Sequence, residues 1–149
     1  MALSRRDRVA EDVVKYFCQH GVSVNGVTYK VKVTSKIPNW KKVLGSKDIE
    51  SDIKKDTFPS GGISLRIQEI LVHPETRGVG RLIILLHEFL HGLDMRLNED
   101  TIDKIAQFFA GMIVDSIIRG YSKSVVLALL ECNLALPPDE WKEPLADAR

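Results

Sequence analysis

A histidine–glutamate–histidine motif is the part of the sequence best suited to chemistry. Residues 87–91 read His-Glu-Phe-Leu-His, which has the H-E-x-x-H form. Residues four apart face the same side of an α-helix, so the imidazoles of His87 and His91 can bind one ion. Glu88 points about a quarter turn away, where its carboxylate can accept a proton from water beside the ion. The motif therefore predicts a zinc (Zn²⁺) site with Glu88 as general base.

The motif supplies two ligands, and a catalytic zinc site takes a third from the protein. Glu99 and Asp103 are four residues apart in the next predicted helix, so they share one face. If the two helices pack antiparallel, Glu99 can be the third ligand, and Asp103 can hold a ligand histidine by its outer N–H. Asp94 is the alternative ligand, although a straight helix separates it from His87 by about 10 Å. The sequence favours Glu99 and leaves Asp94 open.

A hydrolytic site also needs a donor that stabilises negative charge on the substrate oxygen in the transition state. His73 and Tyr121 are the candidates for this role. Neither belongs to a recognisable motif. His73 is equally well explained as a residue at the end of a strand, and Tyr121 as a residue at a helix junction.

Helices that could position these residues are predicted from apolar side chains at helical spacing. The predicted ranges run from Ser4 to Gly21, from Thr76 to Leu97, from Asn98 to Gly120, and onward from Ser122. The second of these contains the motif, and its apolar stripe runs beside the histidines: Val79, Leu82, Leu86, Leu90, Leu93 and Leu97. The third has a predicted buried face formed by Ile102, Ile105, Phe109, Met112 and Ile113, with Ala106 and Ala110 on the face of Glu99.

Strands are predicted where apolar and polar residues alternate. One covers Val27–Val33 after an Asn25-Gly26 turn, and a second covers Ile63–Val72. The alternation in the second changes phase at Glu69, which indicates a bulge or the end of regular pairing. Between them, Ser35–Gly62 is long and polar, and it is either a flap over the substrate groove, hinged at Pro59 and Gly61-Gly62, or a plain solvated loop.

These elements predict an α+β fold in which a small twisted sheet packs on the H-E-x-x-H helix, with further helices behind it. The 149-residue chain has the length of one domain, predicted to span residues 1–136 and to be followed by a tail over 137–149. A formal net charge of +1 gives no reason to expect nucleic acid or an acidic membrane as partner. No apolar run approaches the roughly 20 residues of a membrane span, and we expect a cytoplasmic protein in which Cys18 and Cys132 are buried thiols.

The combined pattern of motif and acidic pair resembles the gluzincin peptidases. It is most similar to the small ImmA/IrrE-type metallopeptidases of bacteria and phages, over roughly Ile63–Ile113. Those proteins carry Glu-x-x-Ala-x-x-Phe-Ala after the motif, where this chain has Glu99, Ile102, Ile105 and Ala106. The resemblance implies a zincin-like fold, and a sheet edge within Gly62–Val72 that pairs with an extended substrate.

The predicted activity is hydrolysis of a peptide or protein substrate by zinc-activated water. A catalytically silent module that binds a partner protein and keeps zinc as a structural ion is the alternative, and hydrolysis of another amide is a third reading. A purely structural site has no need of Glu88, so the complete His-Glu-His set favours an enzyme.

Overall fold

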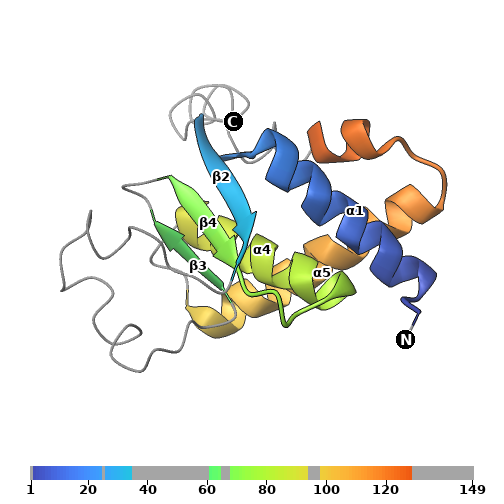
Figure 1. The fold of residues 1–149 in the computed structure, drawn as a ribbon, viewed down its shortest axis with the longest axis horizontal. Coiled ribbons are helices and arrows are strands. Elements are labelled where there is room, and N and C mark those ends of the chain that lie inside the picture. The colour runs from blue at the N-terminus through green and yellow to red at the C-terminus, as the bar shows by residue number, and fades with distance from the viewer. Residues whose placement is uncertain (1, 25, 35–60, 65–67, 94–97, 129–149) are drawn as a thin grey trace, which may run out of the picture.

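The structure, a computed structural model, describes residues 2–24, 26–34, 61–64, 68–93 and 98–128. It confirms the predicted α+β class (Figure 1). The elements are α1 (Arg5–His20), β1 (Val22–Val24), β2 (Val27–Val33), β3 (Gly61–Ser64), β4 (Glu69–Val72), α4 (Gly78–Leu93) and α5 (Glu99–Ile118). Residues 123–128 are also helical.

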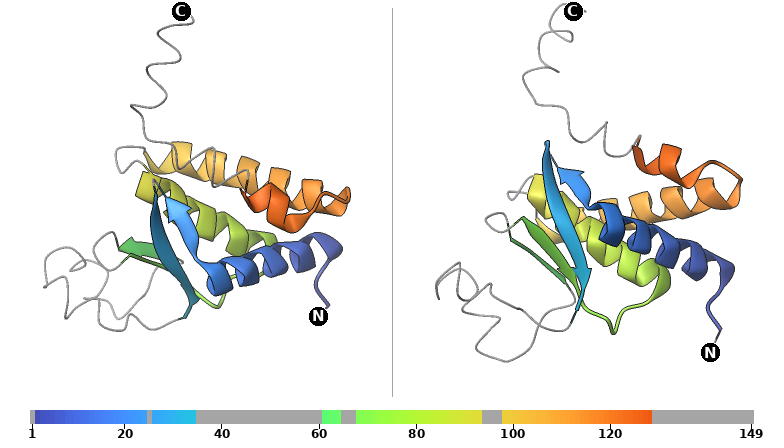
Figure 2. Two further views of the ribbon diagram at one scale, coloured as in Figure 1. Left: turned by 90° about the horizontal axis from the view of Figure 1, so that it is seen from above. Right: turned by 45° about the horizontal axis from the view of Figure 1, so that its top comes forward.

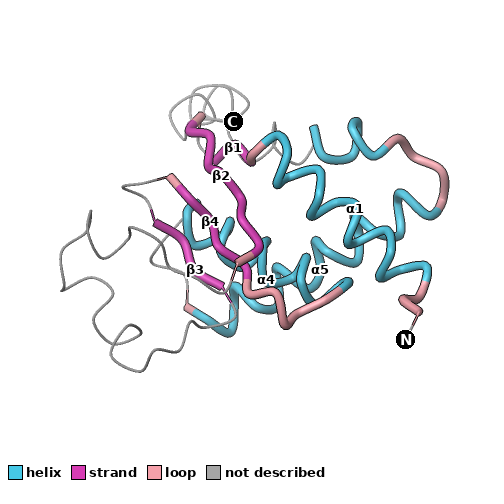
Figure 3. Tube along the Cα trace, in the orientation of Figure 1, coloured by secondary structure: helices cyan, strands magenta, loops and turns pink. Residues whose placement is uncertain are grey.

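The strands form one mixed sheet in the order β1-β2-β4-β3 (Figure 3). β2 and β4 are parallel, with Val31 opposite Ile70, whereas β1 pairs with β2 and β3 with β4 in antiparallel fashion. Tyr29 and Val31 are buried while Lys30 and Lys32 are exposed, which is the alternation that the sequence predicts for β2. In this order β3 lies at an edge of the sheet.

The predicted strand over Ile63–Val72 is wrong in one respect, because the structure has two strands there. β3 and β4 are antiparallel neighbours, with Ile63 opposite Ile70. Gln68 precedes β4 with a φ of 59°, a left-handed conformation that turns the chain. The phase change at Glu69 therefore marks the end of one pairing and the start of another, and it is not a bulge. The three-residue strand β1 was not predicted at all.

The helices pack on one another in layers. α4 contacts β1, β3 and β4 on one side and α5 on the other, so it lies between the sheet and α5 (Figure 2, left). α1 packs against α4, α5 and β2. The H-E-x-x-H motif is in α4, the helix that contacts β1, β3, β4 and α5.

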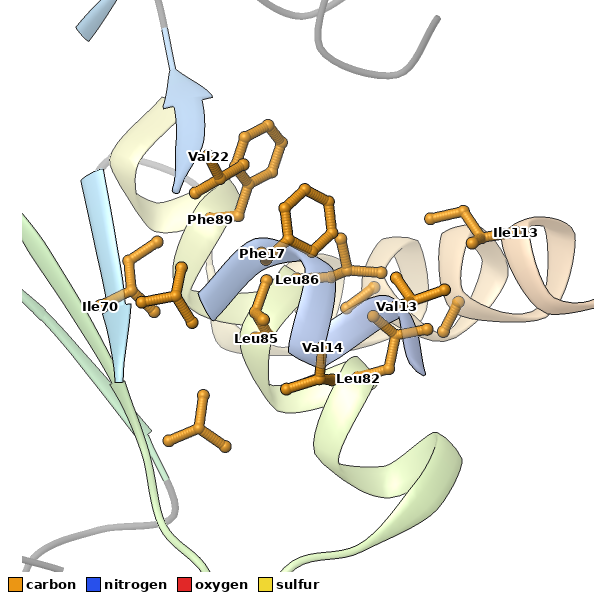
Figure 4. Close-up of a cluster of buried hydrophobic side chains, with 14 of the residues drawn as sticks. Val13, Val14, Phe17, Val22, Ile70, Leu82, Leu85, Leu86, Phe89 and Ile113 are labelled. Carbon is orange, nitrogen blue, oxygen red and sulfur yellow. The ribbon is translucent and has the colours of Figure 1, made fainter. Parts of the chain in front are cut away.

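The core lies where α1, α4, α5 and the sheet meet (Figure 4). Leu82, Leu86 and Leu90 are buried as predicted, but the buried face of α4 is wider and also takes in Leu85 and Phe89. On α5 the prediction for Met112 is wrong, because this side chain is 45% exposed. The small residues Ala106 and Ala110 are fully buried instead, together with Val114.

The start of α4 is held by side chains of α1. The Asp7 carboxylate accepts a hydrogen bond from the Val79 N–H at 3.0 Å, and the Glu11 carboxylate accepts one from the Gly78 N–H at 2.7 Å. Glu11 also forms an ion pair with Arg81 at 2.8 Å. Backbone N–H groups at the start of a helix have no partner within the helix, so these carboxylates satisfy them. The contacts fix the direction in which α4 leaves the sheet.

The first and third long helices begin as the sequence predicts. The Ser4 side chain accepts from the Asp7 N–H at 3.1 Å, and the Asn98 side chain accepts from the Thr101 N–H at 2.8 Å. Both residues are therefore N-caps. Gly120, predicted to close α5, follows its last turn with a φ of 103°.

Several predictions fall outside the described residues. These are the body of the proposed flap (35–60), Asp94, Cys132 and the tail (137–149). Gly61 and Gly62, which were expected to act as a hinge, are strand residues in β3. Cys18 was expected to be buried and is exposed. Within the described part of the chain, none of the helices is long and apolar enough to cross a membrane.

Candidate metal centre

Three side chains with metal-binding atoms converge where the end of α4 meets the start of α5. The Nε2 atoms of His87 and His91 are 3.0 Å apart. The Glu99 carboxylate bridges them, with one oxygen 2.8 Å from His87 Nε2 and the other 2.9 Å from His91 Nε2. We call His87, His91 and Glu99 the metal cluster. The antiparallel contact of α4 with α5 that the sequence analysis assumed is what brings them together.

The metal cluster has the donor types and spacing that a metal ion requires. Each residue offers one ligand atom, and these atoms lie within 4.8 Å of one another. Ligands 2.0–2.1 Å from a tetrahedral zinc are about 3.3 Å apart, so the present separations would have to open by only a few tenths of an ångström. The histidine side chains are 15–16% exposed and that of Glu99 is 69% exposed, which leaves one side open to solvent. The cluster could therefore hold a metal ion and keep a position open for water or substrate.

Asp103 orients one of the histidines. Its Oδ1 atom is 2.7 Å from His87 Nδ1, on the ring nitrogen that does not face the metal cluster. A carboxylate there accepts the Nδ1–H hydrogen and leaves the Nε2 lone pair free for an ion. This is the contact that the Glu99/Asp103 spacing predicted, one helical turn apart on the same face of α5.

Glu88 lies beside the metal cluster but is not part of it. It is 9% exposed, and among the described residues it is the buried charged side chain. Burial raises the pKa of its carboxyl to about 7, since the charged form loses its water; His87 lowers this pKa and the Glu99 carboxylate raises it. A carboxylate whose pKa lies near neutrality can accept a proton at physiological pH and release it again.

One contact of Glu88 was missed by the sequence analysis. A Cβ atom at Gly61, on the edge strand β3, would lie 3.2 Å from Glu88 Cγ and 3.3 Å from Glu88 Oε1. The edge strand therefore passes directly over the glutamate of the motif. The Gly61-Gly62 pair was visible in the sequence, but nothing local indicated which residue it would face.

The two candidates for an oxyanion donor lie outside the two helices that carry the metal cluster. His73 follows β4, in the segment that joins this strand to α4. Its Nδ1 atom accepts the Glu75 N–H at 3.1 Å. Tyr121 follows α5, a 20-residue helix that begins at Glu99 and is about 30 Å long. Tyr121 therefore lies at the wrong end of α5 for this role.

Comparison of the chain with protein-family models, with curated proteins and with solved structures finds no match.

Proposed function

We propose that this protein is a zinc-dependent peptidase of the gluzincin type. The observation that carries the proposal is that His87, His91 and Glu99 converge while Glu88 is buried next to them. His87, His91 and Glu99 would hold the ion, and Asp103 would keep His87 in the tautomer that binds it. Zinc at this position would polarise the substrate carbonyl and a water molecule.

Glu88 would act as general base. Its carboxylate would accept a proton from the attacking water and pass it to the leaving amine. Its burial supports this role, because a carboxylate with an ordinary low pKa would be a weaker base. A zinc site that served only to stabilise the fold would not need a buried carboxylate beside its ligands.

A peptide is the proposed substrate because of the position of β3. This strand is at an edge of the sheet that the described residues form, and it passes next to Glu88. A free strand edge can pair with an extended peptide through backbone hydrogen bonds. Such pairing would hold an extended peptide beside β3, the strand that passes next to Glu88. The resemblance to ImmA/IrrE-type metallopeptidases supports the same substrate class.

The proposal is tested with Glu88→Gln and His91→Ala in protein loaded with zinc. Glu88→Gln keeps the side-chain size and removes the proton acceptor, so it should bind zinc normally and lose hydrolysis by about 10²–10⁴-fold. His91→Ala should lose both zinc and hydrolysis. The readouts are metal content by elemental analysis and mass spectrometry of an unstructured peptide library.

Two outcomes would contradict the proposal. Undiminished hydrolysis by zinc-loaded Glu88→Gln would remove the assigned base. Purified wild-type protein that neither contains nor binds a first-row metal would remove the site. A wild-type protein that binds one zinc but cleaves no peptide would favour the binding module with structural zinc.

A further inference from the structure

Gly61 is in contact with the proposed base and with its helix neighbour. A Cβ atom added to Gly61 would lie 2.6 Å from Ile84 Cγ2, in addition to its contacts with Glu88 Cγ and Oε1 at 3.2 and 3.3 Å. Ile84 and Glu88 are four residues apart on α4, so they face β3 together. At Gly61 the backbone of β3 therefore lies so close to α4 that only the side chains of Ile84 and Glu88 fit between them.

The neighbours of Gly61 have little freedom to move away. Ile84 is β-branched and in a helix, where one χ1 rotamer is strongly preferred. Gly61 is paired with Val72 of β4, and Val72 is fully buried. Further along the same contact, a Cβ atom at Gly92 would lie 2.7 Å from Ile63 Cδ1, so β3 is also seated closely on α4 at that end. A methyl at position 61 would overlap most with Ile84 Cγ2, and it would also push the Glu88 carboxylate, at the end of a longer side chain, by a few tenths of an ångström.

We propose that Gly61 is a positioning residue for Glu88: the missing side chain on β3 allows the Glu88 carboxylate to lie between the edge strand and the metal cluster, aimed at the water that it deprotonates. This inference rests on the proposed function. It gives β3 a role in positioning the Glu88 carboxylate, and this role is separate from any pairing of β3 with substrate. The three atoms nearest to a Cβ at position 61 belong to Ile84 and Glu88 and none to the metal cluster, so we expect Gly61→Ala to leave metal binding unchanged.

The central test compares Gly61→Ala with a variant that removes the clash with Ile84. Ile84→Leu keeps the side-chain volume and removes the Cγ2 branch, so Gly61→Ala/Ile84→Leu retains mainly the contact with Glu88. Both the single variant Gly61→Ala and this double variant should bind zinc with wild-type affinity and show a kcat lowered by at least about 3-fold, less than the roughly 10²-fold cost of a 1 Å misplacement because Glu88 shifts by only a few tenths of an ångström. KM for the most rapidly cleaved library peptide should change little. Ile84→Leu alone should keep wild-type kcat.

Gly92→Ala is the matched control for strain. It introduces a similar overlap at the same contact between α4 and β3, but against Ile63 and away from Glu88. Ile63 Cδ1 is the mobile end of its side chain and alanine favours a helix more than glycine does, so this variant should change thermal stability little and keep kcat per bound zinc. Recovery of kcat in Gly61→Ala/Ile84→Leu, or an equal loss of kcat in Gly92→Ala, would mean that Gly61 acts through packing alone and would overturn the inference.

A spectroscopic readout separates this inference from the proposed function. The ¹³C resonance of the Glu88 carboxyl, assigned by its disappearance in Glu88→Gln, should shift between Ile84→Leu and Gly61→Ala/Ile84→Leu in the zinc-loaded protein. This comparison holds whether or not the wild-type protein cleaves peptides. A shifted resonance in a protein without hydrolysis would support the positioning role while the peptidase assignment fails. An unchanged resonance would overturn the positioning role even in an active enzyme.

Discussion

At the scale of single residues, the contact between Asp103 and His87 has a measurable consequence. Asp103→Asn keeps the shape but removes the charge that supports His87 as a ligand. We expect zinc affinity to fall by about 10–100-fold, the usual effect of losing such a partner, measured by competition with a chromogenic chelator. Asp100→Asn also removes one negative charge, at an exposed position one residue after Glu99. It should change the zinc affinity by no more than a few-fold relative to wild type. If both changes weakened zinc binding equally, the effect of Asp103 would come from its negative charge near the site and not from its hydrogen bond with His87.

Glu88 should make the stability of the metal-free protein depend on pH. The folded-state pKa is raised from 4.5 to about 7, so the folded state binds the proton more tightly than the unfolded state does. This contribution to stability is fully present below pH 4.5 and is lost as the pH rises through 7. It amounts to about 3 kcal/mol at most.

Urea unfolding of chelator-treated protein between pH 5 and 8 measures this effect. Glu88→Gln has no such proton, so the stability of wild type relative to Glu88→Gln should decline across the range. Because both proteins keep the histidines, the titration of those residues largely cancels in the difference. A constant difference from pH 5 to 8 would contradict the raised pKa of Glu88.

At the scale of elements, the cap of α5 links helix stability to the metal cluster. Asn98 caps the helix whose first residue is the cluster residue Glu99. Asn98→Ala should cost about 1 kcal/mol of stability. It should also weaken zinc binding, because the first turn that carries Glu99 frays. Asn98→Ser, which retains a capping oxygen, should restore both properties. Titration calorimetry and urea unfolding provide the two measurements.

Ser4→Ala is the matched control for this cap. The Ser4 side chain accepts the corresponding N-cap hydrogen bond at the start of α1, a helix that carries no residue of the metal cluster. Ser4→Ala and Asn98→Ala should therefore have similar stability losses, and only Asn98→Ala should bind zinc more weakly. Weakened binding in Ser4→Ala would show that any loss of stability reduces affinity.

The elements differ in how well the sequence predicts them. The helices and the caps at Ser4 and Asn98 depend on local spacing and local hydrogen bonds, and the structure has them where the sequence indicates. The β3–β4 turn was misread because Gln68 adopts a positive φ without being a glycine or asparagine. The contact of Gly61 with Glu88 joins a strand to a helix, and no local pattern encodes it. Met112 fits the helical period but is 45% exposed, whereas Ala106 and Ala110 are fully buried.

At the scale of the whole molecule, an ion at the metal cluster would join α4 to α5 and stabilise the folded state. Zinc at about 1,000 times its Kd contributes about 4 kcal/mol. For a chain of this size that corresponds to a rise in Tm of about 8–16 °C. Differential scanning calorimetry with and without chelator should detect the rise in wild type and in Glu88→Gln. His91→Ala should show none, and a full rise in that variant would place the ion elsewhere.

The contacts that assemble the candidate centre differ in how far apart in the sequence their two residues lie. His87 and Asp103 are 16 residues apart, and the metal cluster lies within that interval, so closing it demands little loop entropy. The contact of Glu88 with Gly61 instead requires β3 to pair with β4 and then to dock on α4. In terms of contact order, the contacts that form the metal cluster are local in the sequence, whereas the contact that orients Glu88 is not. A folding chain could therefore acquire the ability to bind metal before it acquires a correctly aimed base, and hydrolysis would begin only once the sheet is complete.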